Sequence, residues 1–290
     1  MDVFRPASLQ EALQVRAAHP EALPIAGGTD VMVDLNFGRR RPEAILDLSR
    51  LAELQVIRRD GARVVLGSGV TYARLMRELP DQVVLWQAAR TVGSPQIRNR
   101  GTVGGNLGTA SPAGDALPAL AVYDADVVLA SVAGSRRLSW RDFLVGPKRN
   151  ALAPDELIVA VEWDTPRGPG SFSKIGTRNA MVIAIAGMCL QVNEPSRGLR
   201  VALGSVGPTI LRAPEAEAFA AGAIEEAGAW SNPRAAVPTD ALVRFGELAA
   251  AAASPIDDVR GTAAYRRHAC AVLARRALTW ALDDRRARAS

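Results

Sequence analysis

The chain has 290 residues, of which 48% are hydrophobic and 22% are charged, so it is long enough to bury a large core. Its net charge of +5 is mildly basic, but the arginine runs are scattered and lack an aromatic stacking pattern, which disfavours nucleic-acid binding. The 2 cysteines form no C-x-x-C motif, which disfavours an iron–sulfur cluster, a cysteine zinc site or a disulfide framework in this chain.

The beginning of the sequence lacks the pattern of a secretory signal, and no apolar run reaches the roughly 18 residues that a membrane span needs. Cysteines without partners fit a reducing compartment. We therefore expect a cytoplasmic protein without a membrane span.

The first hundred residues alternate between helical and strand patterns. Ser8 is followed by Glu11 at the spacing of a capping box, which predicts the start of a first helix. A short apolar strand, the Gly27–Gly28 turn and a second apolar run follow, and then two strand-then-helix patterns. A further helix is expected to stop at Gly93.

A domain boundary is expected near residue 167, in the segment TPRGPGS, because proline and glycine favour a linker there. Residues 1–167 would form one domain, with subdomains of about 1–57 and 58–167, and residues 168–290 a second domain.

The second domain is predicted to begin with three successive strands, an arrangement typical of an antiparallel meander. From Glu215 the pattern is helical and alanine-rich. The final helix carries apolar residues on one face and arginines on its other faces.

Two glycine-rich turns stand out, one over residues 26–30 and one over residues 101–106. Glycine lets a ligand approach the backbone, and successive N–H groups in such turns bind anions such as a diphosphate. Neither turn fits the Rossmann or P-loop pattern. A single Gly–Gly pair is more often a tight turn, but two such turns, each with a neighbouring threonine, favour a nucleotide-binding site.

Four segments together closely resemble the FAD-binding medium subunit of the molybdenum hydroxylases, the xanthine, carbon monoxide and nicotinate dehydrogenase type of enzyme. They are AGGTDVMVDL, GSPQIRNRGTVGGNLGTASPAGD, DELIVAVEW and DDVRGTAAYRRHACAVLARRAL. The resemblance spans nearly the whole chain in the family's order. It implies an α+β fold: a two-part α/β FAD-binding domain of the PCMH type, then a three-stranded antiparallel sheet with a C-terminal helical bundle.

The resemblance also implies the residues that hold non-covalent FAD. The first glycine segment would wrap the diphosphate, the second would contact the diphosphate and ribityl chain, and Asp115 would lie near the adenosine. Lys174 would lie near the isoalloxazine, although it equally fits a surface lysine at a strand end. The full set is Pro24, Ile25, Ala26, Gly27, Gly28, Thr29, Asp30, Val31, Val92, Thr102, Val103, Gly104, Gly105, Asn106, Thr109, Ser111, Asp115, Ile158 and Lys174. No catalytic residue and no metal ligand is expected.

By the same resemblance, the chain would be an electron-transfer subunit and would not act alone on an organic substrate. A large subunit with molybdopterin would hydroxylate a purine, N-heterocycle, aldehyde or similar compound, and a small subunit with [2Fe–2S] clusters would relay the electrons. The assembly would be a dimer of heterotrimers. The acceptor stays open between NAD⁺, a quinone and another carrier, because Asn179, Ala180 and Met181 stand where some NAD-using members carry acidic residues.

Two other classes of function are compatible with the sequence. A free-standing FAD-dependent reductase could share the FAD fold, but it would need a proton donor and a substrate pocket in its C-terminal half. A basic binding protein without a flavin is the third possibility.

Overall fold

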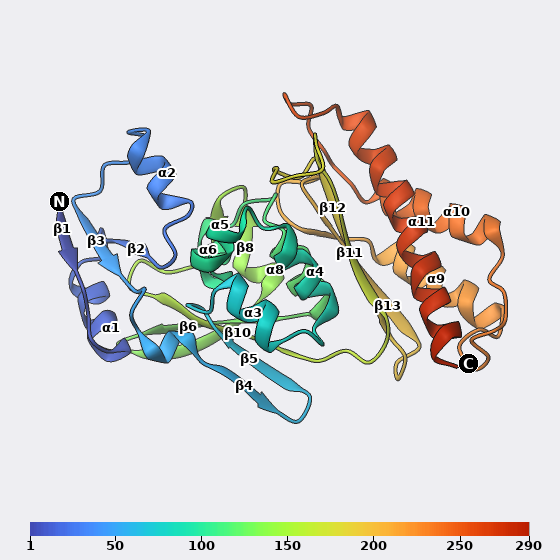
Figure 1. Ribbon diagram of the computed structural model, residues 1–290, viewed down its shortest axis with the longest axis horizontal. Coiled ribbons are helices and arrows are strands. Elements are labelled where there is room, and N and C mark those ends of the chain that lie inside the picture. Colours follow the sequence, from blue (N-terminus) through green and yellow to red (C-terminus); the bar gives the residue numbers. More distant parts are fainter. Residues whose placement is uncertain (290) are drawn as a thin grey trace. The chain divides into compact units, whose positions relative to one another are not determined.

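The computed structural model describes residues 1–289 and divides into two compact units (Figure 1). The first unit comprises Met1–Pro80, Val92–Ser111 and Asp124–Thr165, and the second comprises Asp81–Thr91, Pro112–Tyr123 and Pro166–Ser290. The units are interleaved along the chain, because two helices from the first half belong to the second unit. The domain boundary near residue 167 and the subdivision near residue 57 stay predictions.

The first unit begins with a small parallel sheet in the order β1-β3-β2, with α1 against β3. The predicted helix start at Ser8 is confirmed, because the Glu11 N–H donates to Ser8 Oγ (3.2 Å). The Glu11 carboxylate accepts from the Ala7 N–H (2.7 Å), one residue before the N–H that a capping box uses. Leu46, Leu51 and Leu54 form much of the core beneath this sheet. The elements are β1 (Asp2–Phe4), α1 (Leu9–Ala18), β2 (Leu23–Ile25), α2 (Val31–Asn36), β3 (Ala44–Asp47) and the 3₁₀ helix η1 (Ala52–Gln55).

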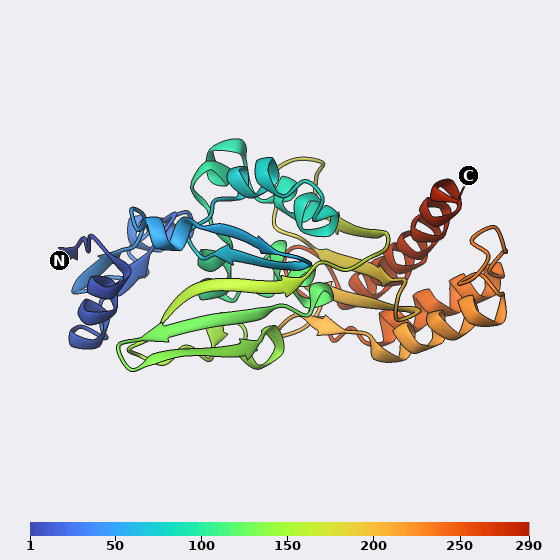
Figure 2. The same ribbon diagram turned by 90° about the horizontal axis from the view of Figure 1, so that it is seen from below.

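A five-stranded antiparallel sheet, in the order β4-β5-β10-β6-β7, forms the rest of the first unit's framework (Figure 2). Its central strand, β10, pairs with β5 and β6 and buries Val161 and Trp163 completely. The strands are β4 (Ile57–Asp60), β5 (Arg63–Gly67), β6 (Asp126–Ser131), β7 (Gly134–Ser139) and β10 (Leu157–Asp164). The other elements are α3 (Tyr72–Glu78), α5 (Pro95–Arg100), α6 (Val103–Thr109), α8 (Trp140–Phe143), β8 (Leu144–Gly146) and β9 (Arg149–Asn150).

The second unit is built on a four-stranded antiparallel sheet in the order β11-β12-β13-β14. The helices α4 and α7 pack on one face, α9 and α11 pack on the other, and α10 packs on α9 and α11. Burial on both faces explains why nearly every residue of β12 is inaccessible to solvent. The elements are α4 (Val83–Thr91), α7 (Ala116–Tyr123), β11 (Gly170–Ile175), β12 (Ala186–Asn193), β13 (Gly198–Gly204), β14 (Leu211–Arg212), α9 (Pro214–Glu226), α10 (Thr239–Ala251) and α11 (Ala263–Arg288).

The predicted α+β fold is confirmed, and three details differ from the sequence expectations. The C-terminal sheet contains the three expected strands and a two-residue fourth strand, β14. The second expected strand corresponds to the apolar run at residues 181–193, but the observed strand begins only at Ala186. The segment read as a second glycine turn is the N-terminus of helix α6, because Thr102 caps it. None of the helices within residues 1–289 has both the length and the apolar character needed to cross a bilayer.

The buried guanidinium of Arg266 on α11 ties three loops of the second unit together. Arg266 is 3% exposed, and its Nη1 donates to the carbonyl oxygens of Ile185 (2.8 Å) and Ser205 (2.6 Å). Its Nη2 donates to Asp258 Oδ1 at 2.7 Å. Removing this guanidinium would leave buried carbonyl groups without donors, which costs free energy.

We predict that Arg266→Met lowers the free energy of unfolding by about 3–5 kcal/mol, because it breaks a buried, hydrogen-bonded ion pair. The matched control is Arg267→Met, since the neighbouring Arg267 is exposed and should change stability by less than about 0.5 kcal/mol. Chemical denaturation of both variants measures the difference. Equal stabilities of the two variants would show that the Arg266 contacts contribute nothing.

Candidate functional site

The structure brings the two glycine segments together in the first unit, although about seventy residues separate them in the sequence. A Cβ on Gly27 would collide with the carbonyl oxygen of Arg100, so the two backbones touch at this point. Close by, Thr109 Oγ1 donates to Asp30 Oδ2 at 3.2 Å. The two segments therefore form one continuous surface of mostly backbone atoms.

The first segment, residues 26–31, presents N–H groups that are not used inside the protein. Within residues 1–289, no oxygen accepts a hydrogen bond from the backbone N–H groups of residues 27–30. The turn depends on Gly28, whose φ of +75° lies in the left-handed region. Asp30 then begins α2 without a side-chain cap. Four successive free N–H groups beside a helix start are suited to an anion such as a phosphate.

The N–H groups of the second segment are largely satisfied within the first unit. The Gly105 N–H donates to Thr102 Oγ1 (2.9 Å), and the Gly104 N–H donates to the carbonyl oxygen of Ser68 (3.1 Å). A Cβ on Gly104 would collide with Ser68, and Gly104 is buried. Gly104 is therefore needed for packing against Ser68, which the sequence did not indicate.

The outward face of α6 is a second candidate ligand surface. Gly105 and Gly108 are exposed and three residues apart, so they share one face of the helix and leave its backbone bare. The buried Oδ1 of Asn106 has no hydrogen-bond partner within residues 1–289. A buried polar atom of this kind is normally satisfied, so a ligand donor fits there. Gly108 was not among the expected residues, although its spacing from Gly105 could have indicated it.

Among the remaining candidate residues of the first unit, Ile158, Pro24 and Ile25 lie next to these two surfaces. Ile158 lies where the register of β10 is irregular, and its Cδ1 is 3.8 Å from a Cβ placed on Gly108. The carbonyl oxygen of Val92 accepts from Arg98 Nη1 at 3.4 Å. Pro24 and Ile25 lie on β2, which leads into the first segment. The expected contacts of Val31, Val103 and Ser111 with a cofactor also stay predictions.

The second unit contains a buried ion pair between two of the candidate residues. Lys174 Nζ lies 2.6 Å from Asp115 Oδ2, and their side chains are 10% and 8% exposed. Thr91 Oγ1 donates to the same carboxylate oxygen at 2.8 Å, and Lys174 also donates to the carbonyl oxygen of Thr91 at 3.3 Å. The alternative that Lys174 is a surface lysine is therefore wrong. The predicted contacts of Asp115 and Lys174 with FAD stay predictions.

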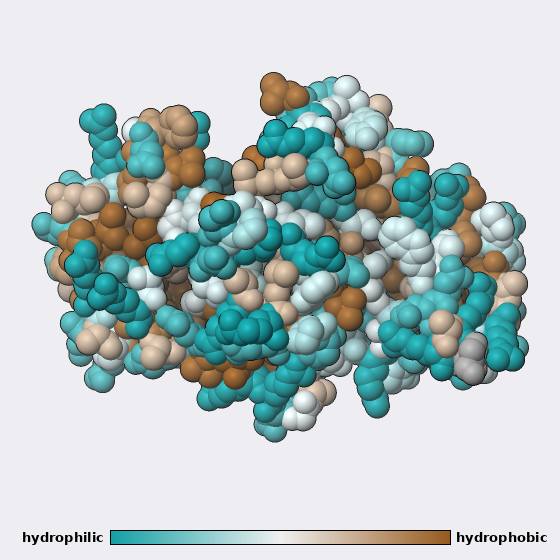
Figure 3. Space-filling view, in the orientation of Figure 1, coloured by the Kyte–Doolittle hydropathy of each residue, from teal (hydrophilic) through white to brown (hydrophobic). Residues whose placement is uncertain are grey.

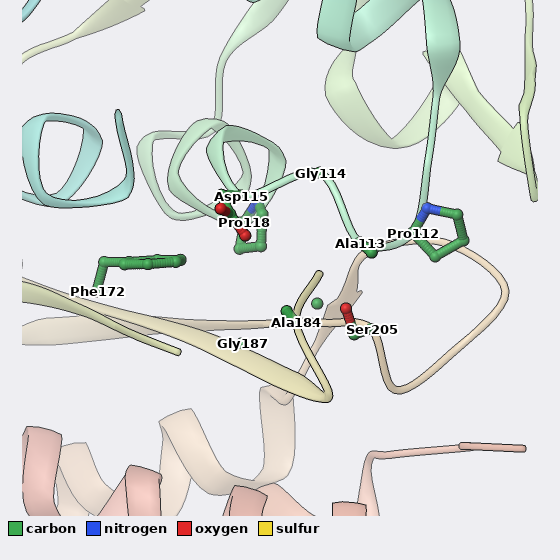
Figure 4. A pocket seen from close by; sticks show the side chains of 10 residues that line it. Pro112, Ala113, Gly114, Asp115, Pro118, Phe172, Ala184, Gly187 and Ser205 are labelled. Carbon is green, nitrogen blue, oxygen red and sulfur yellow. The ribbon is translucent and has the colours of Figure 1, made fainter. Parts of the chain in front are cut away.

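A small cavity adjoins Asp115 within the second unit (Figure 4). Its volume is about 10 Å³, roughly enough for one water molecule. Ser205 reaches from the sheet side toward the 112–115 segment, and its N–H donates to the carbonyl oxygen of Pro112 at 2.8 Å. The cavity is too small for an organic ligand, so it does not compete with the surfaces described above.

We predict that Lys174→Met lowers the free energy of unfolding at neutral pH by about 3–5 kcal/mol, because Asp115 keeps a buried charge without its partner. The double variant Lys174→Met/Asp115→Asn should recover most of this loss, since the asparagine carries no charge. Chemical denaturation of the wild type and both variants tests this coupling. Equal losses in the single and double variants would contradict it.

The same pair predicts a pH dependence. Burial raises the pKa of Asp115, and the charge of Lys174 opposes that rise. Without Lys174 the folded protein should bind the Asp115 proton more tightly than the unfolded chain does. Lowering the pH from 7 toward about 4 should then narrow the stability gap between the single and double variants. A gap that is constant over this range would show that Asp115 does not titrate.

Substitutions of Gly104 and Gly105 should have different effects, because Gly104 is buried against Ser68 and Gly105 is exposed. Gly105→Val should keep the fold, because the only atom within 4 Å of an added Cβ is Thr102 Oγ1 at 3.1 Å. It should lose the flavin dinucleotide expected from the sequence, because the new side chain covers the bare face of α6. Gly104→Ala should instead destabilise the protein by about 1–3 kcal/mol through overpacking. Melting temperature and bound flavin per chain measure both effects.

The control for these variants is Gly222→Val on α9, where a Cβ would meet no atom within 4 Å. It should keep both the stability and the bound flavin. Full flavin retention by Gly105→Val would rule out the outward face of α6 as a ligand surface.

Comparisons with known proteins agree with this architecture. Residues 1–163 match the family described as FAD binding domain in molybdopterin dehydrogenase, and residues 171–281 match the CO dehydrogenase flavoprotein C-terminal domain. The nicotinate dehydrogenase FAD-subunit of Eubacterium barkeri is 36% identical over 205 residues, which cover 67% of this chain and 69% of that protein. The xanthine dehydrogenase FAD-binding subunit of Escherichia coli O157:H7 is 33% identical over 225 residues, covering 73% and 76%.

A solved structure shares the fold over almost the entire length. A chain of quinoline 2-oxidoreductase from Pseudomonas putida 86 superposes with a TM-score of 0.87 at 26% identity, covering 98% of both chains. The relatives named above are subunits of dehydrogenases that carry or bind FAD. The chain therefore belongs to the FAD-binding subunits of the molybdenum hydroxylase-type dehydrogenases, which are oxidoreductases of the xanthine and carbon monoxide dehydrogenase family.

Proposed function

We propose that this chain is the electron-transfer subunit of a heterotrimeric molybdenum hydroxylase. In this proposal it receives electrons at its FAD from a small subunit with [2Fe–2S] clusters and passes them to NAD⁺ or another carrier. A large subunit with molybdopterin would hydroxylate the organic substrate. The observation that carries the proposal is the row of four free N–H groups at residues 27–30 beside the bare face of α6.

Each part of this surface has a proposed role in holding FAD. The free N–H groups of residues 27–30 would donate to the diphosphate oxygens, which need donors once water is displaced. The exposed backbone at Gly105 and Gly108 would let the cofactor lie against α6, and Asn106 Oδ1 would accept from it. Ile158 would supply apolar contact beside that face. Bound FAD supplies chemistry in which electrons arrive singly and leave singly or as a hydride.

We further propose that the organic substrate is a nitrogen heterocycle. This proposal is supported by relatives that are named for nicotinate, xanthine and quinoline. The large subunit would bind the substrate, and this chain would only pass the electrons on to the acceptor. We also propose that two heterotrimers associate into a dimer and that the complex is cytoplasmic. The free, buried Cys189 and Cys270 fit a reducing compartment such as the cytoplasm.

The first test uses the full chain produced alone. It should bind about one FAD and oxidise no nitrogen heterocycle, aldehyde or purine, because the residues described here bind and position a cofactor without forming an acid–base centre. Absorbance spectra give the flavin ratio, and dye-linked turnover gives activity. Substrate turnover by the chain alone would show that it is a free-standing reductase. A colourless chain that does not bind added FAD would show that it is a basic binding protein without a flavin.

The second test uses the complex with both partner subunits. Adding a nitrogen heterocycle should bleach the flavin absorbance in the complex, and no bleaching should occur when the small subunit is omitted. NAD⁺ or a quinone-like dye is then added to the reduced complex. The compound that restores the absorbance spectrum of oxidised flavin is the electron acceptor. Bleaching without the small subunit would contradict the proposed electron route.

A further inference from the structure

The exposed face of α11 differs in charge from the rest of that helix. Four of its arginines are paired with carboxylates: Arg266 with Asp258, Arg285 with Glu194, Arg286 with Asp283 and Arg288 with Asp284. Arg275 and Arg276 are exposed, and no carboxylate within residues 1–289 lies within ion-pair distance of them. Residues 262–282 contain no aspartate or glutamate. These two arginines therefore present uncompensated charge to the outside.

Aromatic side chains flank this charge on the same side of the helix. Tyr265 and Trp280 are 47% and 49% exposed, and His268 is also exposed. At about 100° per residue, these three and the arginine pair fall within an arc of about 140° that spans about 22 Å along the axis. We call Tyr265, His268, Arg275, Arg276 and Trp280 the basic stripe. In Figure 3 the surface along the course of α11 mixes hydrophilic side chains with pale and hydrophobic ones.

The opposite face of α11 is fixed in place, so the basic stripe is a rigid surface. Cys270, Ala274 and Leu278 are buried in the core that α11 forms with β12 and α10. Arg266 and Arg285 anchor the helix near its two ends through carbonyl oxygens of the same unit. A rigid helix that exposes tyrosine, tryptophan and unpaired arginine has the composition of a protein–protein contact, where these residues dominate the binding energy.

We propose that the basic stripe is the docking surface for an acidic face of a partner subunit in the same complex. The partner would supply carboxylates for Arg275 and Arg276 and an apolar recess for Trp280. This inference rests on the proposed heteromeric function. A second copy of this chain fits less well, because residues 262–282 offer no carboxylate that could pair with the arginines of the other copy.

The test compares three forms of the chain assembled with both partner subunits. They are the wild type, Arg275→Glu/Arg276→Glu, and the control Arg234→Glu/Arg244→Glu, which reverses two exposed charges of the same unit away from the stripe. Mass photometry at several salt concentrations gives the dissociation constant of the complex. We expect the stripe variant to weaken assembly at least tenfold and to flatten its salt dependence, while the control stays within twofold.

Two further measurements keep the test independent of folding and of the proposed function. Bound FAD per chain and melting temperature should be unchanged in both double variants, and Trp280→Ala should weaken assembly several-fold at any salt concentration. A colourless wild-type chain would refute the flavin function, whatever the assembly result.

Three outcomes would overturn the docking assignment. They are an unchanged dissociation constant, an equal loss in the control, and a loss of assembly that is accompanied by loss of FAD. Binding of the wild type to phosphatidylserine vesicles or single-stranded DNA, abolished in the stripe variant while assembly is intact, would assign the stripe to that anion instead.

Discussion

The backbone of Gly27 lies directly against the backbone of Arg100, and this contact is possible only because residue 27 has no side chain. It holds the first glycine segment against the end of α5, and the hydrogen bond from Thr109 to Asp30 links the same segment to α6. Gly27, which packs against Arg100, and Gly28, which has a positive φ, each lose much backbone conformational entropy when the chain folds. That cost is consistent with a cofactor site, where a side chain would occupy the space that the ligand needs.

The glycines of this region fall into two physical classes. Gly27 and Gly104 are bare because protein atoms lie against them, whereas Gly105 and Gly108 are bare and face outward. Gly27 and Gly104 allow the protein segments to pack together, whereas Gly105 and Gly108 leave backbone atoms exposed to a ligand. The N–H groups follow the same division, since those of Gly104 and Gly105 are used internally and those of residues 27–30 are not. An anion bound at this surface would therefore find more free N–H donors on the first segment than on the second.

Much of the fold was predictable because its signals are local. The helix start at Ser8, the helix that ends before Gly93 and the antiparallel C-terminal sheet all follow from short patterns, and the resemblance supplied the overall class. The helical state of residues 103–109 was missed because glycine disfavours a helix, and here the Thr102 cap and packing against Ser68 outweigh that preference. The interleaving of the two units depends on long-range packing, which no local pattern contains.

The sequence predicted which residues form the candidate site, but it did not predict which of them pack against protein and which face a ligand. The sequence indicated both glycine segments, yet it treated Gly104 and Gly105 alike, and only the position of Ser68 distinguishes them. The buried pair of Lys174 and Asp115 was likewise hidden, because the two residues are far apart in the sequence and meet across the second unit's own packing.

The most direct test of the central claim is a crystal structure of this chain with FAD bound. We predict that diphosphate oxygens lie about 2.7–3.2 Å from the backbone nitrogens of at least two of residues 27–30. A diphosphate held elsewhere, with those N–H groups facing only water, would contradict the account.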